Sequence, residues 1–186
     1  MAWIPNQQRR LRQGKSKMNT ALAARQAHQP WCSLTTNALA LSATESAAIA
    51  FLLPLSRDYP EIESWFRLKV VPGLRAGTRT LICVERQASL VAVGIAKHEV
   101  DERKICTVRV MPAYFGRGIG LRLFDSLLRW LDTDQPHLTV SDSKLPAFER
   151  IFERYGFRHT SSHMNLYVPG ATELSYNDVA KVSSRR

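Results

Sequence analysis

The chain has 186 residues, 45% of them hydrophobic, and a formal net charge of +10 at pH 7. This length and composition suit one globular domain with a single hydrophobic core. No stretch approaches the roughly 18 consecutive apolar residues that a membrane-spanning helix needs, so we expect no membrane segment. The three cysteines are scattered and no CxxC motif occurs. This pattern argues against a disulfide framework and against a metal site, and it favours a cytoplasmic protein.

The positive charge is concentrated near the start of the chain. Residues 1–30 contain six Arg and Lys residues and no acid, whereas residues 31–170 are close to charge balance. We therefore expect residues 1–30 to form a disordered basic arm. The same composition resembles an organelle transit peptide, or an overextended start ahead of a true initiator at Met18. A basic arm can also neutralise nucleic-acid phosphates, so nucleic acid is a candidate partner.

The first predicted elements are a strand and two helices. Residues 31–41 suit a short strand. Ser42 and Glu45 have the spacing of a capping box, which predicts a helix that Pro54 ends. A second helix is predicted to start near residue 60, because its apolar residues repeat as one helical face, namely Ile62, Trp65, Phe66 and Val70.

Three strand-like runs come next, at residues 80–84, 90–96 and 105–110. Only short turns separate them, so we expect the three strands to pair antiparallel. A change of pattern follows, because the next apolar residues repeat at helical spacing rather than at every second position.

The second half of the chain alternates helices and strands. Residues 120–130 have the pattern of a strongly amphipathic helix, and residues 137–140 that of a short strand. Pro146 is predicted to open another helix, which Gly156 ends. A last strand is expected over residues 157–168.

Taken in order, the predicted elements read β-α-α-β-β-β-α-β-α-β over residues 31–168, with residues 169–186 as a C-terminal tail. Helices on both sides of a mixed sheet suit this order. We therefore expect a single domain of the α/β (α+β) class.

The loop before the amphipathic helix carries the most specific chemical signal. Gly116, Gly118 and Gly120 stand at alternate positions, which lets the backbone turn tightly and present N–H groups without side-chain obstruction. The helix that follows adds its unpaired N-terminal N–H groups and the positive end of its dipole. These features predict a pyrophosphate site, to which Arg117 adds a cation.

Two segments of the chain resemble the GNAT N-acetyltransferase superfamily. That family's acetyl-coenzyme A motif is similar to Val110-x-Pro112-x-x-Phe115-Gly116-x-Gly118-Ile119-Gly120, and its closing helix-to-strand segment to Glu153-Arg154-Tyr155-Gly156-Phe157. The resemblance implies a mixed, mostly antiparallel sheet flanked by helices. It also implies that two central strands splay apart to admit the thioester of acetyl-coenzyme A.

The resemblance assigns roles to residues around this loop. The backbone of residues 108–110 would pair with the pantetheine arm, and the N–H groups of residues 116–121 would hold the pyrophosphate. The implied cofactor-binding residues are Val108, Arg109, Val110, Phe115, Gly116, Arg117, Gly118, Ile119, Gly120, Leu121 and Phe152.

The catalytic groups depart from the family pattern. Phe115 stands where the family usually has Gln or Arg, and Phe152 stands where it usually has the tyrosine that acts as an acid. Tyr155, one helical turn later, is the substitute candidate for the acid. Glu99 is a candidate general base, and Ser143 could orient a water or the substrate.

The expected function is transfer of an acetyl group from acetyl-CoA to a primary amine by direct attack. Two alternatives stay open: a catalytically impaired coenzyme A-binding module, and a toxin-like acetyltransferase that acts on aminoacyl-tRNA. A dinucleotide site using Asp142 does not fit, because the glycine spacing differs from G-x-G-x-x-G. A P-loop does not fit either, because no Gly-Lys-Ser/Thr occurs. The sequence leaves open the acceptor amine and whether the chain forms a homodimer.

Overall fold

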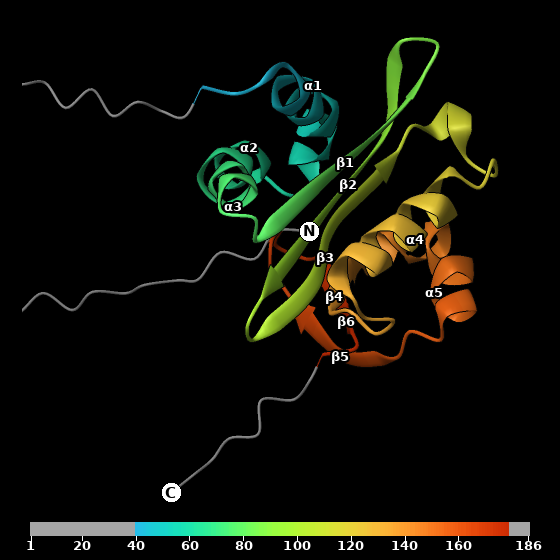
Figure 1. Ribbon diagram of the computed structural model, residues 1–186. Helices are drawn as coiled ribbons and strands as arrows, with labels where there is room; N and C mark the ends of the chain where they lie inside the picture. Colours follow the sequence, from blue (N-terminus) through green and yellow to red (C-terminus); the bar gives the residue numbers. More distant parts are fainter. Residues whose placement is uncertain (1–39, 179–186) are drawn as a thin grey trace, which may run out of the picture.

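The computed structural model describes residues 40–178, which form one layered domain (Figure 1). Its helical segments are α1 (Ala43–Leu52), η1 (Leu53–Arg57), α2 (Ile62–Trp65), η2 (Phe66–Val70), α3 (Val71–Arg75), η3 (Pro112–Tyr114), α4 (Ile119–Leu131), η4 (Asp142–Ala147) and α5 (Glu149–Tyr155). Its strands are β1 (Arg79–Arg86), β2 (Ser89–Glu99), β3 (Glu102–Val110), β4 (Leu138–Ser141), β5 (His159–Met164) and β6 (Thr172–Tyr176). None of the described helices is long and apolar enough to cross a membrane.

The strands form two antiparallel sheets of three strands each. The first has the order β1-β2-β3 and the second the order β4-β6-β5. The two sheets meet where β3 and β4 run parallel. This arrangement confirms the predicted α/β class and the mostly antiparallel pairing.

The contact between the two sheets is confined to one end of β3 and β4. Within residues 40–178, a single parallel bridge joins Lys104 to His137. Its hydrogen bonds run from the Ile105 N–H to the His137 carbonyl oxygen, 3.0 Å, and from the His137 N–H to the Arg103 carbonyl oxygen, 2.9 Å. Beyond the bridge the two strands separate, as the predicted splay requires.

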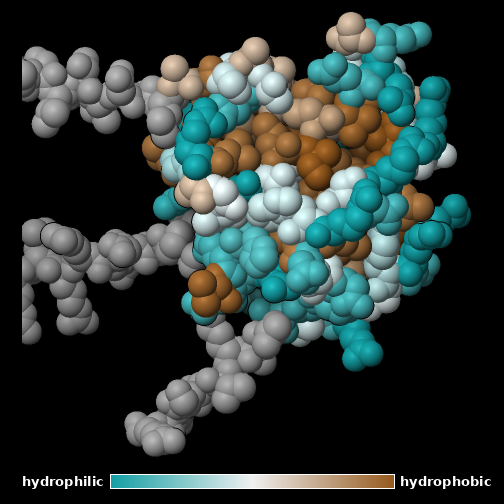
Figure 2. Space-filling model, viewed as in Figure 1, coloured by the Kyte–Doolittle hydropathy of each residue, from teal (hydrophilic) through white to brown (hydrophobic). Residues whose placement is uncertain are grey.

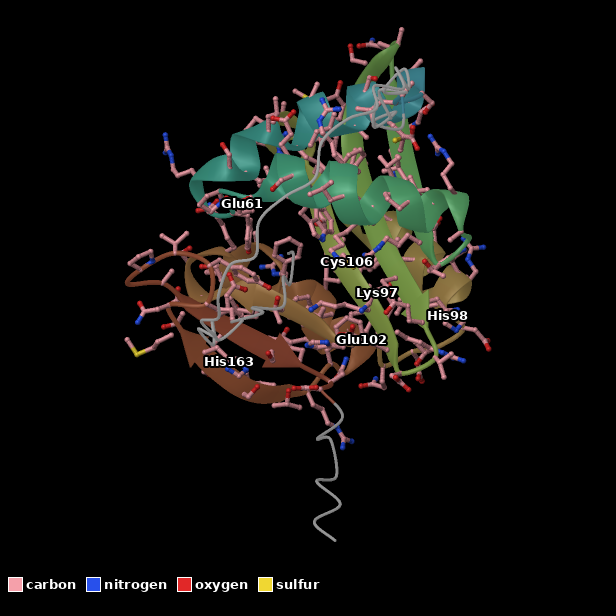
Figure 3. The ribbon with its side chains drawn as sticks, turned by 90° about the vertical axis from the view of Figure 1, so that its left-hand side faces the viewer. Glu61, Lys97, His98, Glu102, Cys106 and His163 are labelled. Carbon is pink, nitrogen blue, oxygen red and sulfur yellow. The ribbon has the colours of Figure 1, made fainter. Side chains whose placement is uncertain are left out.

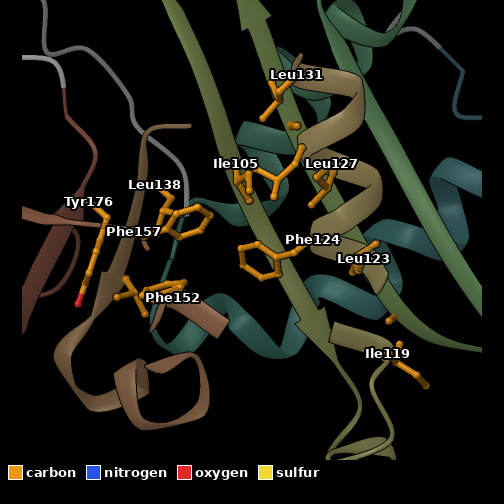
Figure 4. Packing of buried hydrophobic residues seen from close by; sticks show 14 of the residues in the cluster. Ile105, Ile119, Leu123, Phe124, Leu127, Leu131, Leu138, Phe152, Phe157 and Tyr176 are labelled. Atoms are coloured by element: carbon orange, nitrogen blue, oxygen red, sulfur yellow. The ribbon is translucent and has the colours of Figure 1, made fainter. Parts of the chain in front are cut away.

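The helices cover both faces of the sheets (Figure 1). The segments from α1 to α3 pack on one face, against Val93 and Ile95 of β2. Helices α4 and α5 pack on the other, where Phe124 of α4 points into a cluster of aromatic side chains that includes Phe152 (Figure 4). A Cβ atom at Gly94 would lie only 2.9 Å from a methyl carbon of Leu123, so glycine at this position lets α4 approach β2 closely.

Strand β1 is the edge of the first sheet in the described part of the chain. Its central residues are only partly buried, because Ile82 and Val84 pack toward α4 while Leu81 and Cys83 pack toward α1 to α3. In the view of Figure 2, apolar side chains gather in a band between α1 and α4, where this edge lies. The strand predicted at residues 31–41 falls almost entirely outside the described residues.

The end of the domain differs from the prediction. The tail predicted over residues 169–186 contains β6, which is the central strand of the second sheet, so the domain continues past residue 168. The single last strand predicted over residues 157–168 is the shorter β5, followed by a turn that leads into β6. Its turn signal, Pro169-Gly170, was present in the sequence, and the short strand behind it was not recognised. Pro146 also does not open α5, because it lies inside the preceding 3₁₀ segment η4.

A buried carboxylate fixes the helices on the first face. Glu45 completes the predicted capping box with Ser42 at the start of α1. Its two carboxylate oxygens also accept hydrogen bonds from the guanidinium group of Arg75 in α3, at 2.5 and 2.8 Å. These hydrogen bonds from Arg75 and Ser42 lower the pKa of Glu45 from 4.5 to about 2.

Glu45→Gln should reduce the free energy of unfolding at neutral pH by about 1–2 kcal/mol, because the hydrogen bonds to a charged group are weakened. The stabilisation by the carboxylate is fully present above its unfolded pKa of 4.5 and is lost as the pH falls toward about 2. Urea denaturation at several pH values measures both effects. A difference between wild type and variant that is as large near pH 3 as near pH 7 would contradict this account.

Candidate functional site

A cavity of about 900 Å³ lies where β3 and β4 diverge. Its walls come from β3, β4, the loop before α4, the first turn of α4 and the η4–α5 segment. Ten of the eleven residues assigned to cofactor binding line this cavity, and Arg117 is the exception. The guanidinium of Arg117 instead lies over the ring of Tyr114, 5.2 Å from its centre.

The backbone of the loop depends on two of its glycines. Gly116 has a φ of 74° and Gly118 a φ of 71°, which is the left-handed region where a side chain is strained. Gly118 is also the N-cap of α4. The conformation at these two positions turns the chain from η3 directly into the helix, so the loop ends with its amides at the cavity wall.

The amides at this wall are available to a ligand. From Gly116 to Leu121, no N–H group donates a main-chain hydrogen bond within the described residues, and the first helical bond of α4 runs from the Arg122 N–H to the Gly118 carbonyl oxygen at 3.1 Å. Helix α4 has 13 residues, so its positive dipole end adds to the same place. Six consecutive donors at a helix start are suited to binding an anion such as a diphosphate.

Strand β3 offers a second set of main-chain groups. The Met111 N–H donates to the Val91 carbonyl oxygen of β2 at 2.8 Å. In an antiparallel pair the bonding direction alternates, so Arg109 also bonds toward β2 while Val108 and Val110 direct their main-chain groups away from it, toward the cavity. An extended ligand could therefore pair with this edge as an added strand.

The charged residues of the cavity lining are mostly basic. Arg109, Lys144, Arg150 and Arg154 contribute cations, while Asp58 contributes a carboxylate, which lies 3.2 Å from the Lys144 ammonium group. Burial lowers the pKa of Arg109, whose guanidinium lies over the Phe51 ring. An excess of positive charge around a cavity favours an anionic ligand.

The two phenylalanines that depart from the family pattern differ in their surroundings. Phe115 is 58% exposed and lies at the cavity rim. Phe152 is only 3% exposed and forms part of the aromatic core, with its ring centre 4.7 Å from that of Tyr176. Phe152 therefore contributes an apolar wall and no proton donor.

The structure places the Tyr155 side chain away from the cavity, which argues against its predicted role as the acid. Its hydroxyl donates to Asp125 Oδ1 at 2.5 Å, and its ring stacks between Phe124 and Phe157, so it does not line the cavity. Burial and the neighbouring Asp125 raise the pKa of Tyr155 to about 12. The three-residue offset from Phe152 rotates the Tyr155 side chain onto the α4–α5 contact.

Glu99 and Ser143 do not line the cavity either. Glu99 lies at the β2–β3 hairpin, seven residues along β2 from the position paired with Val110, or about 23 Å at 3.3 Å per residue. Figure 3 shows Lys97, the ion-pair partner of Glu99, at this end of the sheet. Ser143 is exposed, and its hydroxyl lies 3.1 Å from that of Ser141.

One polar wall residue was missed in the sequence. Tyr59, between η1 and α2, lines the cavity from the side of the first helices and is only 7% exposed. The sequence showed it only as the residue before a helix-starting proline, which gave no indication of a long-range contact.

Gly118→Ala should lower the free energy of unfolding by about 1–2 kcal/mol, because alanine is strained at positive φ. Gly120→Ala is the matched control, since Gly120 has no positive φ and its added Cβ would lie 3.4 Å from Ile151. The control should be neutral or stabilising, because alanine favours a helix. Denaturant titration of both variants measures this difference, and equal effects would show that the loop has another conformation.

Several solved structures have the same fold as this chain, although their sequences are only 13 to 15% identical to it. A protein from Desulfovibrio desulfuricans that is described as an acetyltransferase of the GNAT family superposes with a TM-score of 0.55 at 15% identity, covering 77% of this chain and 92% of that one. An aminoglycoside 6′-N-acetyltransferase complexed with coenzyme A gives 0.53 at 13% identity, with 71% and 88% covered. The PaiA N-acetyltransferase of Thermoplasma acidophilum, also complexed with coenzyme A, gives 0.52 at 14% identity, with 73% and 92% covered.

The amino-acid sequence identifies the family independently of these superpositions. No curated protein matches the chain by sequence. A family profile described as an acetyltransferase (GNAT) domain matches residues 72–166, which is just over half of the chain and includes β1 to β5. The splayed strands, the glycine loop and this match agree, and the chain belongs to the GNAT acetyltransferase family.

Proposed function

We propose that the protein transfers an acetyl group from acetyl-CoA to an amine by direct attack on the thioester. The observation that carries this proposal is the row of amides from Gly116 to Leu121, which donate no main-chain hydrogen bond within residues 40–178 and lie beside a cavity whose charged residues are mostly basic. These amides would hold the pyrophosphate, and the main-chain groups of Val108 and Val110 would pair with the pantetheine arm. The two structural neighbours that contain coenzyme A have the same fold and support this choice of ligand.

The gap between β3 and β4 would place the thioester within reach of an acceptor. Leu138 and Val140 of β4 and Ile105 of β3 line this part of the cavity with apolar side chains. Such a lining excludes water from the reacting carbonyl and thereby limits hydrolysis. The amine would approach from the side of Tyr59, opposite the loop that holds the diphosphate.

A coenzyme A-binding module without catalysis is the second candidate. Its support is Phe152, which stands where the family usually has a tyrosine acid and is buried in the core. Product formation with an amine panel separates the two candidates, because both would bind coenzyme A. An aminoacyl-tRNA acceptor rests on the basic residues 1–30, which lie outside the described residues.

Gly118→Asp should weaken coenzyme A binding about 10- to 100-fold, because it places a carboxylate against the diphosphate and removes hydrogen bonds to a charged group. Isothermal titration calorimetry measures the affinity. S-acetylpantetheine lacks the diphosphate, so its affinity should change much less.

Gly77→Asp is the matched control for strain. Gly77 also has a φ of 71°, has no atoms within 4 Å of an added Cβ, and does not line the cavity. Its variant should bind coenzyme A as the wild type does. Equal losses in the two variants, or an equal loss for both ligands, would refute the loop as the diphosphate site.

Tyr155→Phe should retain at least about half of the wild-type kcat, because the Tyr155 hydroxyl is bonded to Asp125 outside the cavity. Loss of this hydrogen bond should cost about 1 kcal/mol of stability. Steady-state kinetics with acetyl-CoA and thermal melting measure the two effects. A loss of 100-fold or more in kcat, the range of a lost general acid, would restore Tyr155 as the acid.

A further inference from the structure

A buried carboxylate lies behind the acceptor side of the cavity. Glu173 of β6 is 2% exposed, and its Oε1 accepts a hydrogen bond of 3.1 Å from the hydroxyl of Tyr59. Its Oε2 has no hydrogen-bond partner within the described residues. Tyr59 itself lines the cavity, so its hydroxyl links the cavity wall to a carboxylate that does not line it.

The surroundings of this pair are polar and enclosed. Tyr167, in the loop between β5 and β6, packs edge-on against Tyr59 with ring centres 5.2 Å apart. The Tyr167 hydroxyl and Thr139 Oγ1 are also buried. Leaving a buried polar group such as Glu173 Oε2 unpaired is costly, and a catalytic role is one physical reason for it.

The surroundings of Glu173 act on its pKa in both directions, and burial has the largest effect. Burial raises the pKa of Glu173, and burial together with Glu173 raises that of Tyr59. The hydrogen bond from Tyr59 and the charge of Lys104 in β3 lower the pKa of Glu173, while the charge of Asp142 after β4 raises it. On the other side of the pair, the charges of Asp58 and Tyr167 raise the pKa of Tyr59. A carboxylate in such a site is a stronger base than one in water.

We propose that Tyr59 and Glu173 form a proton relay that deprotonates the acceptor, which arrives as a protonated primary amine. This inference rests on the proposed acetyl transfer. The ammonium group gives a proton to the Tyr59 oxygen while the Tyr59 hydroxyl proton passes to Glu173 Oε1. The neutral amine then forms the C–N bond as the C–S bond breaks. Its second proton ends on the departing thiolate, and Glu173 releases its proton to solvent.

In this relay Tyr59 is the catalytic residue and Glu173 acts through it. The relay assigns a base other than Glu99, which was the candidate base from the sequence. It also separates the two reactants, because the amine contacts the Tyr59 side of the cavity and the diphosphate contacts the Gly116 to Leu121 amides. An acceptor without a titratable amine would gain nothing from this arrangement.

The test uses the full chain with acetyl-CoA and a panel of small primary amines, diamines and peptide N-termini. Glu173→Gln retains an oxygen that can accept from Tyr59, so the fold should be preserved. Its kcat/KM near pH 7 should fall by about 100-fold or more, which is the usual contribution of a general base. Tyr59→Phe should show a similar loss, and the double variant should lose little more, because the two groups act in series.

The pH dependence of kcat/KM distinguishes the relay from a purely structural role of Glu173, because loss of a structural role would not change its shape. The wild-type kcat/KM should be independent of pH between the pKa of Glu173 and the pKa of the amine. Over that range Glu173 is deprotonated and the amine is in the ammonium form that the relay uses. The Glu173→Gln rate should instead rise about tenfold per pH unit with the free amine and approach the wild-type rate at high pH. Asp125→Asn and Tyr155→Phe are matched controls, since they alter a tyrosine–carboxylate pair outside the cavity, and both should retain the wild-type profile.

The outcomes separate the two proposals. If Glu173→Gln and Tyr59→Phe bind coenzyme A normally and keep the wild-type rate and profile, the relay is wrong and the acetyl transfer stands. Additive losses in the double variant would also refute the relay. A wild-type chain that acetylates none of the amines overturns the proposed function and the relay with it.

Discussion

The pairing of β3 with β4 at one end only is the constraint on which the site depends. Within residues 40–178, the backbone of His137 makes the only main-chain bonds between the two strands. The imidazole of His137 also lies 2.8 Å from Glu102 Oε1, and hydrogen bonding from His137 and Lys97 holds the pKa of Glu102 at about 2. Figure 3 shows Glu102 and Lys97 together at this closed end. The strands are thus held firmly at one end and are free to diverge at the other.

A bulge in β3 determines which main-chain groups face the cavity at the diverging end of the strand. The pairing with β2 skips Cys106, so Ile95 lies opposite Thr107 while Ala96 lies opposite Ile105. Before the bulge, the N–H of Ile105 points toward β4. After the bulge, the main-chain groups of Val108 and Val110 point to that same side of β3. The extra residue therefore aligns the free strand edge with the same cavity that the glycine loop faces. Two independent sets of amides converge there, one suited to an extended chain and one suited to a diphosphate.

Features that depend on local interactions could be predicted from the sequence, whereas features that depend on distant contacts could not. The glycine loop and α4 could be predicted because their signals are local: two glycines at positive φ, a helix start, and an apolar stripe that includes Phe124 and Leu127. The capping box of α1 was predicted for the same reason. The splay came from the family resemblance, since no local pattern encodes where two strands stop pairing.

The features that were missed depend on distant contacts. Tyr59 and Glu173 are 114 positions apart and meet only because β6 enters the middle of the second sheet. With residues 169–186 taken as a tail, Glu173 could not be considered for the site. Tyr155 was chosen by its closeness in sequence to Phe152, whereas its helical phase turns it toward Asp125. Sequence spacing was sufficient to bring most of the predicted cofactor-binding residues to one cavity, but it could not show which polar side chains lie beside that cavity.

Amide hydrogen exchange with and without acetyl-CoA tests the central claim most directly, because it reads the two sets of main-chain donors one by one. The account predicts that the amides of Val108, Val110 and residues 116–121 exchange more slowly when acetyl-CoA is bound. Amides of the closed end, such as that of Ile105, which already bonds to His137, should change little. Unchanged exchange at both the strand edge and the loop, at a saturating ligand concentration, would contradict it.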